Sequence, residues 1–471
     1  MTTPQTIASA AQALRAGGIT ATELAQASIA IADALDDKVG IYIHRFDQQL
    51  LTGAAAADEA FAKGDDPGPL AGIPLGIKDI ISTTGATTTG QSVVMDPQWG
   101  IDTGDAVVIT RLREAGGLIS GKLTTMEFAS DAPDESKPFP ICRNPWDLER
   151  WPGGSSSGTA SGVITGAILG GLGTDTGGSI RMPAAYSGIT GLMPSIGRVP
   201  KSGCLPLGYS LDHIGPMARS AEDCAIMLNA LAGYDASDPA CFDEPTEDYT
   251  AGLTGDLSGV TIGIDLTSGR ANAADVLDPA LDGLLESAIA VLKERGANVV
   301  EVEIPLYDEA MLAQKAIGAG EPGAYHRVDA QTQYENYTYG FRQRLATGTF
   351  FSAADYVQGQ RVRRVVVKRV NAEVFTQVDM VLTPTAFRPA LELAVFKTGD
   401  TRKWMGSGNT SYWNLTGHPV IAVPMGFNAD GLPMSFQLAG RPFAEASILK
   451  AAHAYQQDTD FHLAVPAIAQ I

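Results

Sequence analysis

Cysteine and positive charge are both scarce in this sequence. The 471 residues include 4 cysteines, and none of them follow the C-x-x-C spacing typical of zinc sites. So few cysteines cannot form a stabilising disulfide framework in a chain of this length, and we expect a reducing compartment. The 33 lysine and arginine residues are outnumbered by 53 aspartate and glutamate residues, which gives a formal net charge of −20. Such an acidic surface repels phosphate backbones, so no nucleic-acid partner is expected.

Long apolar runs are also missing. No run reaches the ~18 residues that a membrane span needs. The first residues, MTTPQTIASAAQALRAGG, lack the basic region and apolar region of a signal peptide. We therefore expect no membrane partner and a cytoplasmic location. The one basic run, residues 361–369, alternates with valines and predicts a solvated helix face.

The remaining pattern alternates predicted helices and strands. Thr20 and Glu23 form a capping-box signal before a long helix. Residues 306–370 are aromatic and helical, and we expect them to form a cover over the functional site. We find no repeat and no linker, so residues 1–471 are expected to form a single large α/β/α domain with a mixed, mostly parallel central sheet covered by helices. Strands are predicted at 72–80, 118–122, 260–264, 298–302, 380–383, 420–424 and 434–439, and helices at 49–63, 105–115, 220–232, 279–295 and 445–457.

Lys78 is the first residue with possible chemistry, because it lies in the apolar predicted strand GIPLGIKDI. A lysine on the exposed side of an edge strand would give the same pattern. If the lysine is buried instead, desolvation disfavours its cation and can lower its pKa by up to ~3–5 units. A neutral amine can accept a proton from a hydroxyl group.

Two glycine-rich stretches follow, WPGGSSSGTASG at 151–162 and GLGTDTGGSIRMPAA at 171–185. The first could be a flexible Gly/Ser loop, although it runs directly into an apolar helix, as a packed turn does. In the second, Gly177 and Gly178 precede Ser179, and successive N–H groups in such a turn can hold an oxyanion. A phosphate-binding loop is the competing interpretation, but neither nucleotide-binding glycine pattern is present.

Histidine offers no clear alternative base for a serine nucleophile. The 6 histidines are scattered, and none lies in a glycine-rich turn. There is also no G-x-S-x-G nucleophile elbow with a credible histidine partner. A buried Lys78 is therefore the candidate base.

Taken together, GIPLGIKD, PGGSSSG and GTDTGGSIRMPAAYSGITGL resemble the amidase signature family. Further similar segments are RVPKSGCLPL at 198–207, SLDHIGPMARSAED at 210–223 and much of 414–455, so the resemblance covers nearly the whole chain. It implies a signature core at about 65–225. One departure is Thr124, where many members of the family have asparagine, and this leaves the substrate open.

The resemblance implies a serine hydrolase without metal or organic cofactor. Ser179 would be the acylated nucleophile, Ser155 the bridging serine after a cis peptide bond, and Lys78 the general base. The implied oxyanion hole consists of the N–H groups of Thr176, Gly177, Gly178 and Ser179. Substrate contacts are implied for Ala129, Ser130 and Gly154, and structural support for Asp175 and Arg181.

The implied reaction is hydrolysis of a C–N acyl bond. We expect a stand-alone monomer or homodimer that acts on a small aryl or alkyl amide, ester or carbamate (urethane), because the aromatic region 325–356 suits an apolar substrate. The alternative is the A subunit of a tRNA-dependent amidotransferase, which releases ammonia from glutamine for a partner protein.

Overall fold

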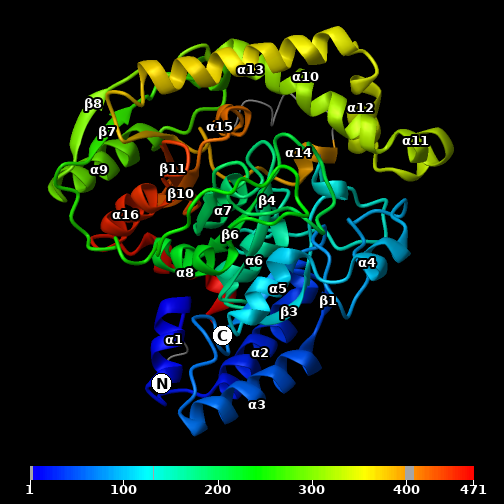
Figure 1. Ribbon diagram of the computed structural model, residues 1–471, viewed down its shortest axis with the longest axis vertical. Coiled ribbons are helices and arrows are strands. Elements are labelled where there is room, and N and C mark those ends of the chain that lie inside the picture. The colour runs from blue at the N-terminus through cyan, green and yellow to red at the C-terminus, as the bar shows by residue number, and fades with distance from the viewer. Residues whose placement is uncertain (1–3, 131, 398–407, 471) are drawn as a thin grey trace.

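The computed structural model describes residues 4–130, 132–397 and 408–470 (Figure 1). Within these residues, eleven strands form one sheet in the order β1-β3-β2-β4-β6-β5-β10-β11-β9-β7-β8. A single α/β domain with a large mixed sheet is therefore confirmed. The strands are β1 Tyr42–Arg45, β2 Pro74–Lys78, β3 Leu118–Leu123, β4 Gly170–Asp175, β5 Thr190–Met193, β6 His213–Ala218, β7 Thr261–Ile264, β8 Asn298–Glu301, β9 Met380–Pro384, β10 Val420–Phe427 and β11 Pro433–Gly440.

The sheet is less parallel than the sequence suggests. Neighbouring strands are parallel at four interfaces, which lie within β3-β2-β4 and β9-β7-β8. The other six interfaces are antiparallel. The prediction of a mostly parallel sheet is wrong because it overlooked β1, β4, β5 and β6. Three of the six antiparallel interfaces involve β6 or β1, and a fourth is the β10–β11 hairpin, whose short connection requires antiparallel strands.

Helices cover both faces of the sheet, as β4 shows. A side chain at Gly170 would point toward Met227 of α8, whereas one at Gly171 would point toward Thr159 of α6. Successive residues of a strand face opposite sides, so α8 and α6 lie on opposite faces. The longer helices are α1 Ile7–Arg15, α2 Ala21–Val39, α3 Asp47–Lys63, α5 Val107–Glu114, α6 Ser157–Thr165, α8 Ala221–Leu231, α9 Leu281–Glu294 and α16 Glu445–Gln456; the shorter ones are α4 Pro97–Thr103, α7 Arg181–Ser187, α14 Ala394–Lys397 and α15 Ser411–Thr416.

Residues 307–373 form the helical segment predicted as a cover. It consists of α10 Tyr307–Tyr325, α11 Arg327–Gln333, α12 Tyr339–Gly348 and α13 Ala353–Glu373. In Figure 1 this segment, in yellow and yellow-green, arches over one end of the molecule, opposite α1, α2 and α3. We call it the cover from here on. Val366 and Val370 of α13 are buried within its packing.

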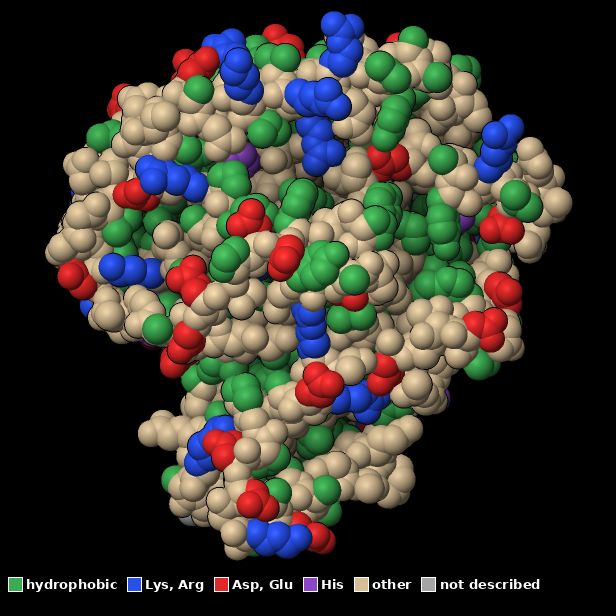
Figure 2. Space-filling view, in the orientation of Figure 1, with side chains coloured by type: hydrophobic (Ala, Val, Ile, Leu, Met, Phe, Trp, Pro, Cys, Tyr) green, Lys and Arg blue, Asp and Glu red, His purple; other side chains and the backbone are tan. Residues whose placement is uncertain are grey.

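The basic run lies on the outer side of α13. Arg361, Arg364, Lys368 and Arg369 are exposed, and Figure 2 shows lysine and arginine side chains along this rim of the molecule. The prediction of a solvated helix face is confirmed for these four residues. Arg363 differs, because it is half-buried and donates to Ser210 Oγ (3.2 Å). None of the described helices is both long enough and apolar enough to cross a membrane.

Local signals at helix ends are confirmed. The Thr20 side chain accepts a hydrogen bond from the Glu23 N–H, and Glu23 Oε2 accepts from the Thr20 N–H (2.8 Å). This capping box satisfies two N–H groups that have no partner inside the helix. Most of the predicted elements are present within one to three residues of the predicted ends, because they carry apolar periodicity and such caps.

Candidate active site

Lys78 ends β2, a strand buried between β3 and β4. Its side chain is 0% exposed. Its Nζ donates to Ser155 Oγ (2.6 Å), Thr174 Oγ1 (2.7 Å) and Ser156 Oγ (3.1 Å). Among the described residues Lys78 forms no ion pair, so only hydroxyl groups and more distant charges oppose the cost of burying its charge.

This burial lowers the pKa of Lys78 from 10.5 to about 7. Desolvation is the largest cause, because a buried cation loses its hydration. Cys204 in its ionised form and the carboxylates of Asp175 and Asp212 act in the opposite direction, since negative charge favours the cation. About half of Lys78 is thus a neutral amine at pH 7, the form that a general base requires.

Ser155 and Ser156 start the turn that precedes α6. The Gly154–Ser155 peptide bond is cis, and the Ser155 carbonyl accepts a hydrogen bond from Thr125 Oγ1 (2.9 Å). Gly154 is half-buried, and a side chain there would approach Met126 Sδ to 2.3 Å. Only glycine fits at this position without displacement of its neighbours.

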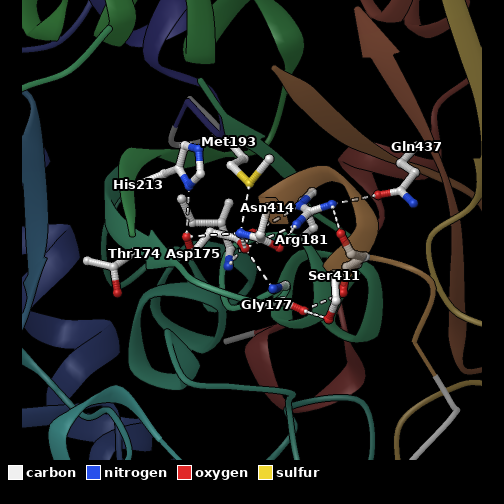
Figure 3. Close-up of polar contacts among 12 residues, drawn as sticks. Thr174, Asp175, Gly177, Arg181, Met193, His213, Ser411, Asn414 and Gln437 are labelled. Atoms are coloured by element: carbon white, nitrogen blue, oxygen red, sulfur yellow. Dashed lines mark hydrogen bonds and ion pairs between the residues drawn. The ribbon is translucent and has the colours of Figure 1, made fainter. Parts of the chain in front are cut away.

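Asp175 ends β4 and organises the turn that carries Ser179 (Figure 3). Its carboxylate accepts hydrogen bonds from the N–H groups of Gly178 (2.6 Å) and Ile180 (3.1 Å). It also forms a fully buried ion pair with Arg181, with Nε to Oδ2 at 3.0 Å. Burial alone would raise the pKa of Asp175, but the charge and hydrogen bonds of Arg181 and a hydrogen bond from Asn414 hold it well below its ordinary value.

Arg181 connects this turn to two distant elements. Its Nη1 donates to the Thr410 carbonyl (3.0 Å) and to Gln437 Oε1 of β11 (3.1 Å). Its Nη2 donates to Asn414 Oδ1 of α15 (2.7 Å). The five N–H donors of a guanidinium group allow one side chain to hold all these partners at once. In Figure 3 Arg181 lies between Asp175 and Gln437, while the Thr174 hydroxyl points away from this network.

Ser179 lies at the half-buried tip of the turn. Its hydroxyl group forms no hydrogen bond with another described residue, but its carbonyl accepts one from the Ser156 N–H (3.2 Å). The structure therefore connects Lys78 to Ser155 directly, and it brings Ser179 to the same turn through the backbone of Ser156. Hydrogen bonds between catalytic groups are often long without substrate.

The four predicted oxyanion donors are not equivalent. The Gly178 N–H already donates to Asp175, whereas those of Thr176, Gly177 and Ser179 have no partner among the described residues. The Gly177 carbonyl accepts hydrogen bonds from Thr410 Oγ1 (2.6 Å) and Ser411 Oγ (3.1 Å). Gly178 has φ +130°, and a side chain there would approach Thr410 Oγ1 to 2.2 Å, so this position requires glycine.

The predicted substrate-binding residues lie in two segments: Gly154 directly precedes Ser155, and Ala129 and Ser130 follow Thr125 by a few residues. Ala129 ends the short 3-10 helix η1 (Glu127–Ala129), and Ser130 follows it; both are buried. Thr124 donates from Oγ1 to the Gly40 carbonyl (2.7 Å), so its hydroxyl group ties two segments of the chain together. Contact of Ala129, Ser130 or Gly154 with substrate stays a prediction.

Three hydroxyl groups at the site were missed by sequence analysis. Thr174 and Ser156 hydrogen-bond to Lys78, and Thr125 hydrogen-bonds to Ser155. Ser156 had a weak signal, as the middle residue of SSS. The two threonines had none, because threonine is common in strands and loops.

A cavity of about 150 Å³ lies behind the Ser179 turn, lined by Thr174, Thr176, Cys204, Asp212 and His213 among others. His213 Nδ1 donates to the Asp175 carbonyl oxygen (3.1 Å). Burial lowers the pKa of His213 to about 4, so the ring is neutral near pH 7. Its Nδ1 holds the turn through the Asp175 carbonyl, and its buried Nε2 forms no hydrogen bond with a hydroxyl group of a described residue, so the structure does not connect His213 to Ser155 or Ser179.

Two aromatic side chains of the cover are buried in its own packing, and a third lies on the outer surface. Tyr337 and Phe341 are 0% exposed and pack with Phe128 and His326. Phe350 lies outside and is 87% exposed. These three side chains therefore give no support to an aryl substrate.

A second buried lysine, Lys122, lies in β3, next to the strand that carries Lys78. Its Nζ is 3.2 Å from Asp79 Oδ1, and both side chains are 0% exposed. It also donates to the Ile81 carbonyl and to Thr88 Oγ1 (2.9 Å). Asp79 follows Lys78 in sequence, so this ion pair anchors the backbone next to Lys78. No group of three or more His, Cys, Asp or Glu side chains that could hold a metal ion occurs in the part of the chain that the structure describes.

Comparison with known proteins assigns the family. The sequence model of the family named Amidase matches residues 23–449. This is most of the chain, so the protein belongs to the amidase family. Its fold agrees with that of solved members.

Similar proteins include both amidotransferase subunits and amidases. The A subunit of glutamyl-tRNA(Gln) amidotransferase from Chloroflexus aggregans is 38% identical over an alignment of 490 positions, gaps included, which covers 99% of this chain and 98% of that protein. The structure of native peptide amidase from Stenotrophomonas maltophilia is 29% identical, with a TM-score of 0.82 over 96% of both chains. The structure of the corresponding amidotransferase protein from Thermotoga maritima is 30% identical, with a TM-score of 0.77 over 95% of both chains.

Proposed function

We propose that this protein hydrolyses a C–N acyl bond through an acyl-enzyme on Ser179, with Lys78 and Ser155 as a proton relay. The observation that carries the proposal is the short hydrogen bond between a fully buried Lys78 Nζ and Ser155 Oγ (2.6 Å). Membership of the amidase family supports the same reaction class. Residues 65–225 would supply the relay, and the cover would set the shape of the substrate site.

The acylation step follows from these positions. Ser179 Oγ attacks the acyl carbon, its proton passes to Ser155, and the Ser155 proton passes to neutral Lys78. The N–H groups of Thr176, Gly177 and Ser179 would hold the oxyanion, while Gly178 holds Asp175. When the C–N bond breaks, Ser155 protonates the leaving nitrogen and is reprotonated by Lys78. Water then attacks the acyl-enzyme by the same relay, which releases the carboxylic acid and restores Ser179.

A second candidate is the glutaminase reaction of an amidotransferase A subunit. The curated relatives support this candidate more directly than a stand-alone amidase, because they are 36–38% identical over at least 94% of this chain. The higher TM-score of the peptide amidase supports a stand-alone enzyme. Both candidates use the same relay and differ in the amide and in the need for a partner protein.

One set of assays tests both proposals. Purified protein is incubated with p-nitroanilides, p-nitrophenyl esters and carbamates, a peptide amide and glutamine, and ammonia and aniline release are measured separately. Fast turnover of anilides, carbamates or the peptide amide by a monomer or homodimer supports the stand-alone enzyme. Ammonia from glutamine alone, together with co-purification of a partner protein, supports the amidotransferase. If no acyl compound is hydrolysed and Ser179 is not acylated, the proposed function is wrong.

A further inference from the structure

A short segment, Thr125–Ala129, runs between the relay and the cover. At one end, Thr125 Oγ1 donates to the Ser155 carbonyl (2.9 Å), and the Thr125 N–H donates to Gln91 Oε1 (2.8 Å). At the other end, Glu127 and Phe128 contact the cover. The bridging serine and the cover are thus connected through only a few residues.

Glu127 is a buried carboxylate with three donors, and the residue is 3% exposed. Oε2 accepts from both the N–H and the Oγ1 of Thr338 (2.7 Å each), and Oε1 accepts from Ser92 Oγ (2.6 Å). Thr338 is the N-cap of α12, and its own hydroxyl oxygen accepts from the Phe341 N–H. Hydrogen bonds to an ionised acceptor are stronger than those between neutral groups, so this contact fixes the start of α12.

The next two residues have strained backbones. Phe128 has φ +45° and Ala129 has φ +63°, a region that side-chain-bearing residues rarely occupy. Each such residue costs on the order of 1–3 kcal/mol and persists only where its surroundings hold it. The Phe128 N–H donates to the Gly90 carbonyl (2.8 Å). Its ring packs on His326 (4.3 Å between centroids) and Phe341 (5.5 Å) of the cover.

We propose that Glu127 and Phe128 are positioning residues that hold the cover in place over the relay and thereby determine which acyl groups the enzyme accepts. The inference rests on the proposed function, because it takes Ser155 to be part of the relay. Glu127 fixes α12 by its carboxylate, and Phe128 fills the space beneath His326 and Phe341. Only Met126 separates Glu127 from Thr125 at the relay end of the segment, and the strained Phe128–Ala129 backbone aims the Phe128 ring at the cover. Loosening either contact lets the cover move and changes the wall of the acyl site without removing a catalytic group.

The test uses Glu127→Gln and Thr338→Val, with Ser92→Ala as the matched control. Glu127→Gln replaces one acceptor oxygen by a donor, and Thr338→Val removes one donor to Glu127 while it keeps the size of the side chain. Ser92→Ala removes a hydrogen bond from the same carboxylate, but on the side away from the cover. Amide hydrogen exchange of residues 326–345 is measured in the full chain, with α8 as the internal reference.

We expect exchange of 326–345 to become roughly tenfold faster in Glu127→Gln and Thr338→Val, the factor that one hydrogen bond to a charged group is worth. Ser92→Ala should change it far less. In parallel, kcat/KM for p-nitrophenyl hexanoate relative to p-nitrophenyl acetate should shift by a similar factor in the two cover variants, with kcat for acetate nearly constant.

Two results would overturn this inference. One is exchange in 326–345 that is unchanged in both cover variants, or equally faster in Ser92→Ala. The other is faster exchange with no change in the hexanoate-to-acetate ratio. If the wild-type protein hydrolyses no acyl compound and Ser179 is not acylated, the proposed function fails, and the exchange measurement still decides whether Glu127 holds the cover.

Discussion

The titration of Lys78 gives one prediction with consequences for both activity and stability. Folding lowers its pKa from 10.5 to about 7, mainly because the buried amine loses its hydration. With a pKa of 7, about half of the lysine is neutral at pH 7 and about one tenth at pH 6. With its ordinary pKa, only about one molecule in three thousand would be neutral at pH 7.

For activity, the neutral amine is the form that accepts the Ser155 proton. We therefore expect kcat/KM for a p-nitroanilide to rise about tenfold per pH unit below pH 7 and to level off above pH 8. Lys78→Met should remove this rise of kcat/KM with pH, which we call the activity limb. Amide hydrolysis should fall further than p-nitrophenyl ester hydrolysis, because an amine must be protonated to leave and p-nitrophenolate need not be.

For stability, the direction of the pH dependence follows from whether the folded or the unfolded state binds more protons. Between pH 7 and 10.5 the unfolded lysine is protonated and the folded one is mostly neutral, so unfolding takes up a proton and stability rises with pH. Using the two pKa values, the amine costs about 4 kcal/mol of folding free energy at pH 7 and about 2 kcal/mol at pH 9. The free energy of unfolding should therefore increase by about 2 kcal/mol more in wild type than in Lys78→Met over this range.

Urea unfolding of both proteins at pH 7, 8 and 9, followed by circular dichroism, measures this difference. Titration of other groups largely cancels between the two proteins. A constant difference across the three pH values would mean that Lys78 does not titrate in this range. An activity limb that survives unchanged in Lys78→Met would identify another group as the base.

Three other changes test separate parts of the site. Ser179→Ala should abolish turnover and labelling by a fluorophosphonate while circular dichroism stays unchanged; mass spectrometry of the wild type should find the label on the Ser179 peptide, and a label elsewhere would refute this assignment. Lys122→Met should reduce the free energy of unfolding by about 3–5 kcal/mol, because it leaves the Asp79 charge buried alone; the double variant with Asp79→Asn should recover much of the loss, and full stability of the single variant would contradict the role of the pair. Arg181→Lys should lower kcat by about tenfold or more, because one ammonium group cannot hold Asp175, Gln437 and Asn414 together; equal kcat in the two proteins would show that this network is dispensable.

The sequence alone determined the features that depend on neighbouring residues. The strand that carries Lys78, the glycine-rich turn before Ser179 and the Thr20–Glu23 cap all follow from local periodicity and from the backbone preferences of single residues. The resemblance to the amidase signature family also implied that Lys78, Ser155 and Ser179 act together. The structure places Lys78 against Ser155, and the family match supports the reaction class.

Other features were decided only by the tertiary structure. The strand β4, GGLGTD, was overlooked because glycine has little preference for strands. Its glycines are needed because neighbouring elements on both faces of the sheet approach this backbone too closely for a side chain. The Gly178 N–H is occupied by Asp175, and the aromatic rings of the cover pack against Phe128.

Thr174 reaches Lys78 across 96 residues of sequence, and Glu127 reaches Thr338 across 211. Contacts at such separations depend on how the sheet order and the packed helices bring the segments together. Residue type and local spacing do not specify that arrangement, since the same threonine or glutamate is compatible with many surroundings.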